Sequence, residues 1–155
     1  MIAHLKVTTL VLFALLTAFI VRTAVGHPLW IMTRGMVPTL FDGDLVWVSS
    51  RRPTFGDVVK VRFDNAPGVY RIVGTEGQEV EIINGRLFVD SLPVQGTSIQ
   101  MVDAPGAGCG IDRVPASTVD LQGRRFHVVA GGEQPLIRVP KGHVYVLGDH
   151  RGVAG

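Results

Sequence analysis

The chain has 155 residues and a formal net charge of only +2, and its fifteen basic residues are scattered along it. So weak a positive balance excludes a nucleic-acid-binding protein that depends on a basic patch. A single cysteine, Cys109, excludes an intrachain disulfide, and it lies in a Gly-rich stretch without a suggested histidine partner. The five histidines show no metal-ligand spacing, so we expect no metal and no cofactor.

The N-terminal segment contains an uncharged apolar run over residues 7–21, with Lys6 before it and Arg22 after it. Basic residues at both ends can extend a short membrane span by snorkelling. The alternative is a cleaved leader, because Ala24-Val25-Gly26 has the small residues of a cleavage site. Arg22 lies where the apolar core of a leader would meet that site, and this favours a retained anchor.

We therefore expect residues 1–26 to form one N-terminal transmembrane helix in the inner (cytoplasmic) membrane. His4 and Lys6 give a positive-inside bias, which predicts that residues 27–155 form one domain on the periplasmic or extracellular side. The lipid bilayer is then the first expected partner of the chain.

The remainder of the chain is typical of a small antiparallel β domain. Short apolar or alternating runs predict strands at 45–48, 57–63, 70–73, 125–129 and 143–147. Residues 79–90 predict a hairpin, because Asn84-Gly85 supplies the positive φ angles of a type I′ turn. Residues 93–119 are interpreted as an insertion over the sheet, in which Ile99, Met101 and Val102 could pack on the domain or on a partner. No long amphipathic helix is expected after residue 25, so the predicted fold class is all-β, a small barrel or coiled sheet.

Four short motifs follow the apolar segment in order. The first is Gly35-Met36-Val37-Pro38-Thr39-Leu40, with Gly43-Asp44 close behind it. The others are Gly56-Asp57, Tyr70-Arg71 with Gly74, and Gly148-Asp149 with Arg151. In this order, behind an anchor, they make the chain resemble the bacterial type I signal peptidase family over nearly its whole length. The resemblance implies a signal-peptidase-type β domain in which Gly43, Asp44, Gly56, Asp57, Arg71, Gly74, Gly148, Asp149 and Arg151 are structural.

The same resemblance implies that both catalytic groups are missing. The family uses a serine nucleophile and a lysine whose burial keeps it neutral. Gly35 stands at the serine position and Tyr70 at the lysine position. A buried tyrosine stays a neutral phenol, because burial raises the pKa of an acid that is charged when deprotonated. Thr33 stands where the family places an oxyanion-hole serine, and Ala154 where a serine would orient the lysine.

Other residues could carry chemistry only by an unfamiliar route. Ser49 and Ser50 are the nearest hydroxyls after the first motif, and a turn-capping role is the simpler interpretation. Lys60 could be a relocated base, although it lies on a different predicted strand from Tyr70. Asp44, Asp57 and Asp149 are expected to bond backbone amides in turns, with a paired-carboxylate acid–base site as the alternative.

Three functions are compatible with this pattern. The first is a catalytically inactive, signal-peptidase-like membrane protein that binds a membrane or secreted protein partner as an assembly or accessory subunit. Its peptide groove would include an edge strand at Met36, Val37, Pro38, Thr39 and Leu40, where an extended peptide adds to the sheet. The second is an active endopeptidase that cleaves signal peptides with a non-standard site. The third is a structural subunit of a membrane complex in which the old cleft has no role.

Overall fold

The computed structural model describes residues 2–63, 66–94, 99–105, 111–121 and 123–152. The chain divides into two compact units. The first contains Met1–Trp30 and Leu45–Arg52, and the second contains Ile31–Asp44 and Pro53–Gly155. The first unit thus includes residues 27–30 and 45–52 as well as the predicted N-terminal segment 1–26.

The first unit is one helix followed by a two-stranded sheet. Helix α1 spans Ile2–Val25, and strand β1, His27–Trp30, pairs antiparallel with β2, Leu45–Val48. Gly26 joins helix to sheet at a φ of 115°, and a Cβ there would lie 2.0 Å from the carbonyl oxygen of Val48. Only glycine allows this approach. Within the described residues, no helix combines the length and apolarity needed to cross a membrane.

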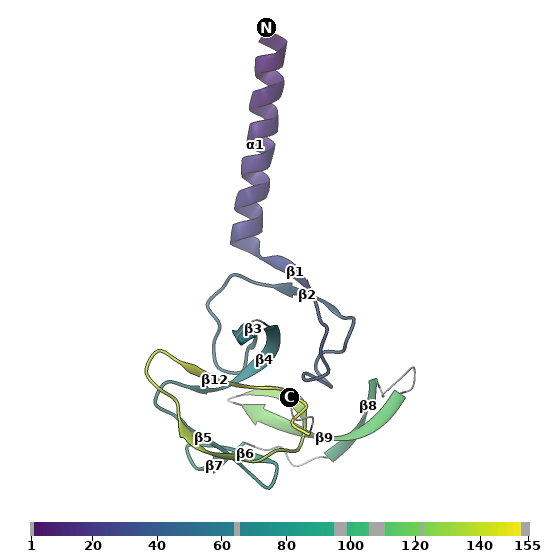
Figure 1. Ribbon diagram of the computed structural model, residues 1–155, viewed down its shortest axis with the longest axis vertical. Helices are drawn as coiled ribbons and strands as arrows, with labels where there is room; N and C mark the ends of the chain where they lie inside the picture. The colour runs from purple at the N-terminus through teal and green to yellow at the C-terminus, as the bar shows by residue number, and fades with distance from the viewer. Residues whose placement is uncertain (1, 64–65, 95–98, 106–110, 122, 153–155) are drawn as a thin grey trace. The chain divides into compact units, whose positions relative to one another are not determined.

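The second unit consists of three antiparallel sheets, with strand orders β12-β4-β3, β11-β5-β6-β7 and β10-β9-β8 (Figure 1). The prediction of an antiparallel all-β domain is confirmed. The strand bounds are β3 Val58–Phe63, β4 Ala66–Thr75, β5 Glu79–Ile83, β6 Arg86–Val89, β7 Leu92–Pro93, β8 Ile99–Pro105, β9 Ile111–Leu121, β10 Arg124–Val129, β11 Gln134–Arg138 and β12 Val144–Leu147.

The predicted Asn-Gly hairpin is confirmed. Asn84 has a φ of 51° and Gly85 a φ of 73°, and these two residues join β5 to β6. Both positive angles match the right-handed twist of the flanking strands. Burial alternates along both strands, so one face of the hairpin points into the core.

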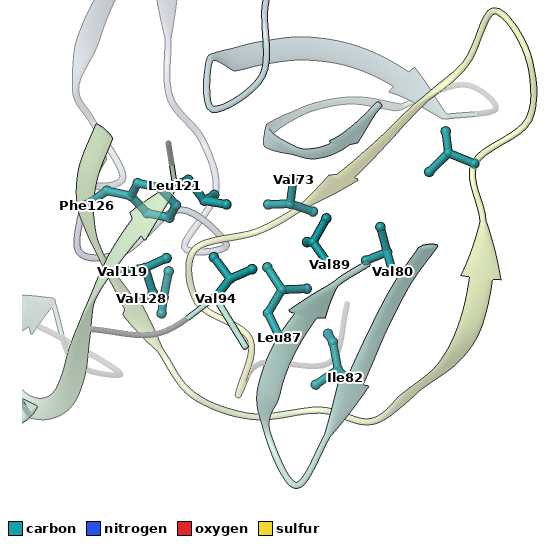
Figure 2. Packing of buried hydrophobic residues seen from close by; sticks show 11 residues of the cluster. Val73, Val80, Ile82, Leu87, Val89, Val94, Val119, Leu121, Phe126 and Val128 are labelled. Carbon is teal, nitrogen blue, oxygen red and sulfur yellow. The ribbon is translucent and has the colours of Figure 1, made fainter. Parts of the chain in front are cut away.

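A single hydrophobic core joins all three sheets. Figure 2 shows its side chains directed toward one another from strands that are far apart in sequence. Removing this shared apolar surface from water is the main force that holds the sheets together. The buried members are Val73, Val80, Ile82, Leu87, Val89, Val94, Val119, Leu121, Phe126, Val128 and Val139.

The prediction of a loop-like insertion over residues 93–119 is wrong, because most of the described residues in this range belong to strands. β8 and β9 pair along their whole common length, from Ile99 opposite Ser117 to Pro105 opposite Ile111. Ladder hydrogen bonds and β-branched residues outweigh the loop-like composition. Ile99 and Met101 do not pack on the core, since 75% and 56% of their surface is exposed. Cys109 lies outside the described residues.

Candidate functional site

The segment predicted as an edge strand is instead a hydrogen-bonded turn. The amides of Thr39 and Leu40 both donate to the carbonyl oxygen of Met36, at 2.8 and 3.0 Å. Met36 and Val37 are fully buried, whereas Thr39 is exposed. Pro38 has no amide proton, so it could not complete the ladder of a strand here. An edge strand at 36–40 is therefore excluded, while a role of these residues in peptide binding stays a prediction.

Gly35 lies against the segment that follows β12. Its carbonyl oxygen accepts the amide of His150 at 3.0 Å, and a Cβ built on Gly148 would lie 2.5 Å from that oxygen. Glycine at 148 is thus required by the approach of the two backbones. The amide of Gly35 donates to the hydroxyl oxygen of Thr33 at 3.1 Å. The amide proton of Gly35 is therefore used in the bond to Thr33, whereas the hydroxyl proton of Thr33 remains available for donation.

The backbone at Gly35 leaves room for a side chain. Its φ angle is not positive, and an added Cβ would meet only the Thr33 hydroxyl oxygen, at 3.4 Å. That distance is an ordinary van der Waals contact. The absence of a nucleophilic oxygen at this position is therefore a property of the sequence and is not imposed by steric exclusion.

Tyr70 lies on β4 close to the same point. It directly precedes Arg71, whose partner Leu147 directly precedes Gly148. The fold thus brings the serine position, in the turn at Gly35, close to the lysine position on β4. The ring of Tyr70 packs edge-on against Phe63, with centroids 5.3 Å apart, and its hydroxyl reaches back over Gly68.

Lys60 does not replace the missing amine. It lies on β3 beside Val59, which is the residue paired with Tyr70. Since neighbouring residues of a strand point to opposite faces, Lys60 is directed away from the face that carries Tyr70. Ser49 and Ser50 follow β2 in the first unit, where Ser49 accepts the amide of Arg51 as a turn residue.

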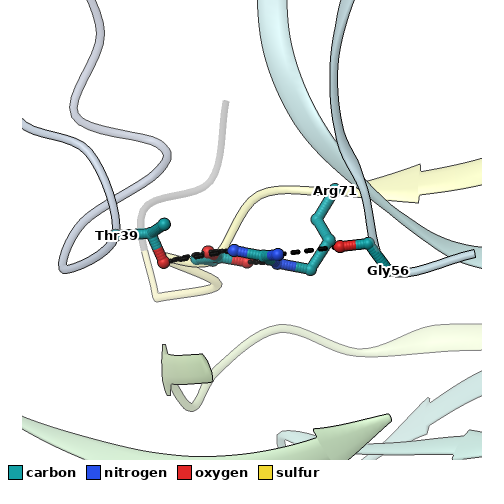
Figure 3. A network of polar contacts seen from close by, with 4 residues as sticks. Thr39, Gly56 and Arg71 are labelled. Atoms are coloured by element: carbon teal, nitrogen blue, oxygen red, sulfur yellow. Dashed lines mark hydrogen bonds and ion pairs between the residues drawn. The ribbon is translucent and has the colours of Figure 1, made fainter. Parts of the chain in front are cut away.

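A buried ion pair connects the motifs to one another (Figure 3). Arg71 donates from Nε to Oδ1 of Asp149 at 2.9 Å and from Nη2 to Oδ2 at 2.6 Å. Its Nη1 donates to the carbonyl oxygen of Gly56 at 2.9 Å. The hydroxyl of Thr39 donates to Oδ2 of Asp149. The guanidinium also stacks 4.0 Å above the ring of Phe126. One cation therefore links all four sequence motifs.

The three Gly-Asp aspartates have separate partners. Asp44 accepts the amide of Phe41 and Asp57 the amide of Thr54, each at 2.8 Å, so both are turn residues as predicted. Asp149 differs from the prediction, because its carboxylate binds Arg71 and Thr39 rather than backbone amides. The three carboxylates do not meet, and the paired-carboxylate alternative has no geometric support.

The remaining motif residues are structural. Gly43 has a φ of 92° and closes the 31–44 loop by donating to the carbonyl oxygen of Ile31 at 2.8 Å. A Cβ on Gly74 would lie 2.6 Å from a Val80 methyl group in the core. Burial lowers the pKa of Arg151 to about 10; the charge of Arg71 acts in the same direction and that of Asp149 opposes both. Ala154 lies outside the described residues.

Two features were missed by sequence reasoning. Phe126 was predicted only as part of a strand, yet it carries the Arg71 guanidinium. A Cβ on Gly131 would lie 2.6 Å from the Cα of Gly152, so the loop after β10 packs backbone to backbone on the end of the last motif. The Gly131-Gly132 pair was the only available signal for the second contact. Among the described residues, no group of three His, Cys, Asp or Glu side chains is placed to hold a metal ion.

Comparison with known proteins decides the family. The profile described as signal peptidase, peptidase S26, matches residues 4–154. This chain belongs to the signal peptidase S26 family. It is 26% identical to the probable signal peptidase I-1 of Synechocystis, with 92% of this chain and 66% of that protein covered. It is 24% identical to signal peptidase I of Bacillus amyloliquefaciens, over 91% of this chain and 68% of that protein.

A plant member is similar as well. The thylakoidal processing peptidase 1 of Arabidopsis thaliana is 27% identical over 89% of this chain and 38% of its own length. The chain thus spans about two thirds of the bacterial relatives and a smaller part of the plant protein.

The Arg71–Asp149 pair predicts a large loss of stability on truncation. Arg71→Ala leaves a buried carboxylate without its cation and should lower the free energy of unfolding by about 3–5 kcal/mol. The exposed pair of Arg113 with Asp103 is the matched control, and Arg113→Ala should cost at most about 1 kcal/mol. Urea denaturation measures both. The double change Arg71→Met with Asp149→Leu should be less damaging than Arg71→Ala; equal losses for all three variants would contradict a buried pair.

Asp57 predicts an acid-dependent component of stability. The pKa of Asp57 is lowered from 3.8 to about 2. The hydrogen bond from the Thr54 amide is the largest cause, and Arg124 contributes in the same direction. A carboxyl group whose pKa is lower in the folded state stabilises the fold above the unfolded value and loses this effect as pH falls. The stability difference between wild type and Asp57→Asn should therefore shrink between about pH 4 and pH 2.

Carboxyl NMR titration checks the cause of that effect. In Arg124→Gln the pKa of Asp57 should rise only part of the way, because the hydrogen bond from Thr54 remains. A stability difference that stays constant across the acid range would show that Asp57 does not carry this dependence.

Proposed function

We propose that this chain is a non-catalytic member of the signal peptidase S26 family that binds an extended peptide segment of a membrane or secreted partner. The observation that carries the proposal is that the residues joining the four motifs are present, while the two catalytic positions lack catalytic side chains. Arg71 joins the four motifs, while positions 35 and 70 carry neither an attacking oxygen nor an amine.

The size of the chemical loss supports this reading. In a well-studied serine protease, removing the nucleophile costs on the order of 10⁶-fold in kcat, and removing the base as well adds little. Tyr70 supplies a phenol in place of that amine. Its ring also lies back over Gly68 and against Phe63, so the hydroxyl is directed along its own strand.

The edge of β4 offers a place for such a peptide. β4 pairs with β3 over Ala66–Arg71, but with β12 only over Arg71–Thr75. Along the first half of β4, the edge away from β3 therefore has no strand partner among the described residues. An extended peptide could add there by β-augmentation. This half of β4 ends at Arg71, whose Nη2 donates to the hydroxyl oxygen of Thr39, one residue of the predicted set.

The proposal includes attachment to the inner membrane by a single N-terminal helix. Residues 7–21 carry no charge, and the described side chains of α1 are exposed along residues 6–20. An anchor of this kind would hold the β domain at the periplasmic or extracellular surface, as an accessory subunit beside its partner. It would also raise the effective concentration of peptides that leave the same bilayer.

Peptide binding without cleavage is the first test. We expect a signal-peptide-like peptide to protect the backbone amides of residues 66 and 68–70 from hydrogen exchange, while those of β5 and β6 are unchanged. Mass spectrometry should recover the peptide intact. A matched peptide with prolines at alternate positions of its extended part should not bind, because it lacks donors for the ladder. Cleavage by the wild-type chain, or protection confined to other strands, would overturn the proposal.

Restoring the two missing groups is the second test. Gly35→Ser should fold normally, because the site accommodates a Cβ. Alone it should not cleave, since no neutral amine lies at position 70. We expect cleavage only in the double variant Gly35→Ser with Tyr70→Lys, measured with a quenched fluorescent signal peptide. Cleavage by the single variant would reveal another base near Gly35, and an inactive but folded double variant would show that groups beyond these two have also been lost.

A further inference from the structure

Strand β8 forms the outer edge of its sheet. It pairs with β9 on one side, and the strand order β10-β9-β8 places no other described strand beyond it (Figure 1). With seven residues it is the longest of the strands that end a sheet in the second unit. The outer side of such a strand presents unpaired amide and carbonyl groups, which another extended chain can bind.

The other outer strands of comparable length carry features that block such pairing. Charged side chains and prolines on an edge discourage strand addition. β3 carries Lys60 and Arg62, β10 carries Arg124 and Arg125, and β11 carries Pro135 and Arg138. β8 has no basic residue, and its one acidic side chain, Asp103, is paired with Arg113 of β9 at 3.1 Å. Its one proline, Pro105, is the last residue of the strand.

Apolar side chains lie exposed beside this open edge. Ile99 and Met101 share one face of β8 and are more than half exposed, and Pro115, also exposed, lies opposite Met101 on β9. Among the described residues, the outer edge of β8 therefore combines backbone groups that have no strand partner with the exposed apolar side chains of Ile99 and Met101. That combination suits a β-strand partner whose own exposed face is also apolar.

We propose that two copies of this chain associate through β8, antiparallel and edge to edge, so that two three-stranded sheets become one continuous sheet. A two-fold axis at Met101 places Met101 opposite its own copy and Ile99 opposite Asp103. Residues 99–103 then form the ladder, and Pro105, which has no donor, lies beyond its end. This is an isologous contact, which closes after two chains.

Charge supports this register for a second copy. Each Asp103 faces an uncharged Ile99, and the two Asp103 positions lie four residues apart along the strands, roughly 13 Å. Exposed charges at this separation are largely screened at physiological salt. Each carboxylate also keeps its own Arg113, so the pairing does not bring like charges together.

The first test is the oligomeric state of the full chain in detergent, measured by sedimentation. We expect a dimer that Met101→Lys weakens roughly tenfold or more, because it places two ammonium groups opposite each other across the axis. Leu136→Lys, the same type of change at an exposed site on β11, is the matched control and should leave the dimer intact. Circular dichroism establishes that both variants fold. A monomeric wild type, or a dimer unaffected by Met101→Lys, would overturn the proposal.

Cysteine crosslinking tests the register of the two β8 strands, whether or not the two α1 helices also associate. In a Cys109→Ser background, Met101→Cys should form an intermolecular disulfide on mild oxidation, because directly opposite Cβ atoms lie about 4.5–5.5 Å apart. Ile99→Cys should not, since the two copies of that residue are roughly 13 Å apart. Crosslinking at 99 but not at 101 would exclude this pairing.

Discussion

The bidentate contact between Arg71 and Asp149 is the constraint on which the rest of the site depends. Both side chains are buried, so each would carry a large desolvation penalty without the other. The contact also fixes backbone positions, because Arg71 binds the Gly56 carbonyl oxygen and the Thr39 hydroxyl as well. The contact thereby holds together a turn, a strand and the segment after β12. These parts are more than a hundred residues apart in sequence at their extremes.

This arrangement shows that the framework of the four motifs does not depend on the residues at positions 35 and 70. The residues that hold the site together are an ion pair, glycines at close backbone contacts and apolar side chains, and none of them is a reacting group. A buried neutral lysine is a source of instability, because burial opposes its charged form. Tyr70 packs against Phe63 and over Gly68 without that penalty. On the proposed function, a chain without the reacting pair avoids this cost while the scaffold remains.

Local chemistry made part of this structure predictable. Asn84-Gly85 determined a hairpin because few residues accept two successive positive φ angles. The turn roles of Asp44 and Asp57 likewise follow from interactions with amides three residues away. Asp149 was not predictable in this way, since its partner lies 78 residues earlier in the chain. The turn at 36–40 was missed because its buried Met36 and Val37 resemble strand residues in composition, whereas the hydrogen bonds to Met36 define it.

The β8–β9 hairpin was the largest error of sequence reasoning, and its cause is informative. Glycine, proline and serine around it suggested a loop, yet pairing between two extended segments supplies a ladder that composition does not reveal. The sequence does show that Ile99 and Met101 are apolar residues at alternate positions. They are exposed on a strand that has one neighbour among the described residues. An edge without a basic residue or a bulge is unfavourable in an isolated domain, and an intermolecular strand contact is the simplest physical reason for a sequence to retain one.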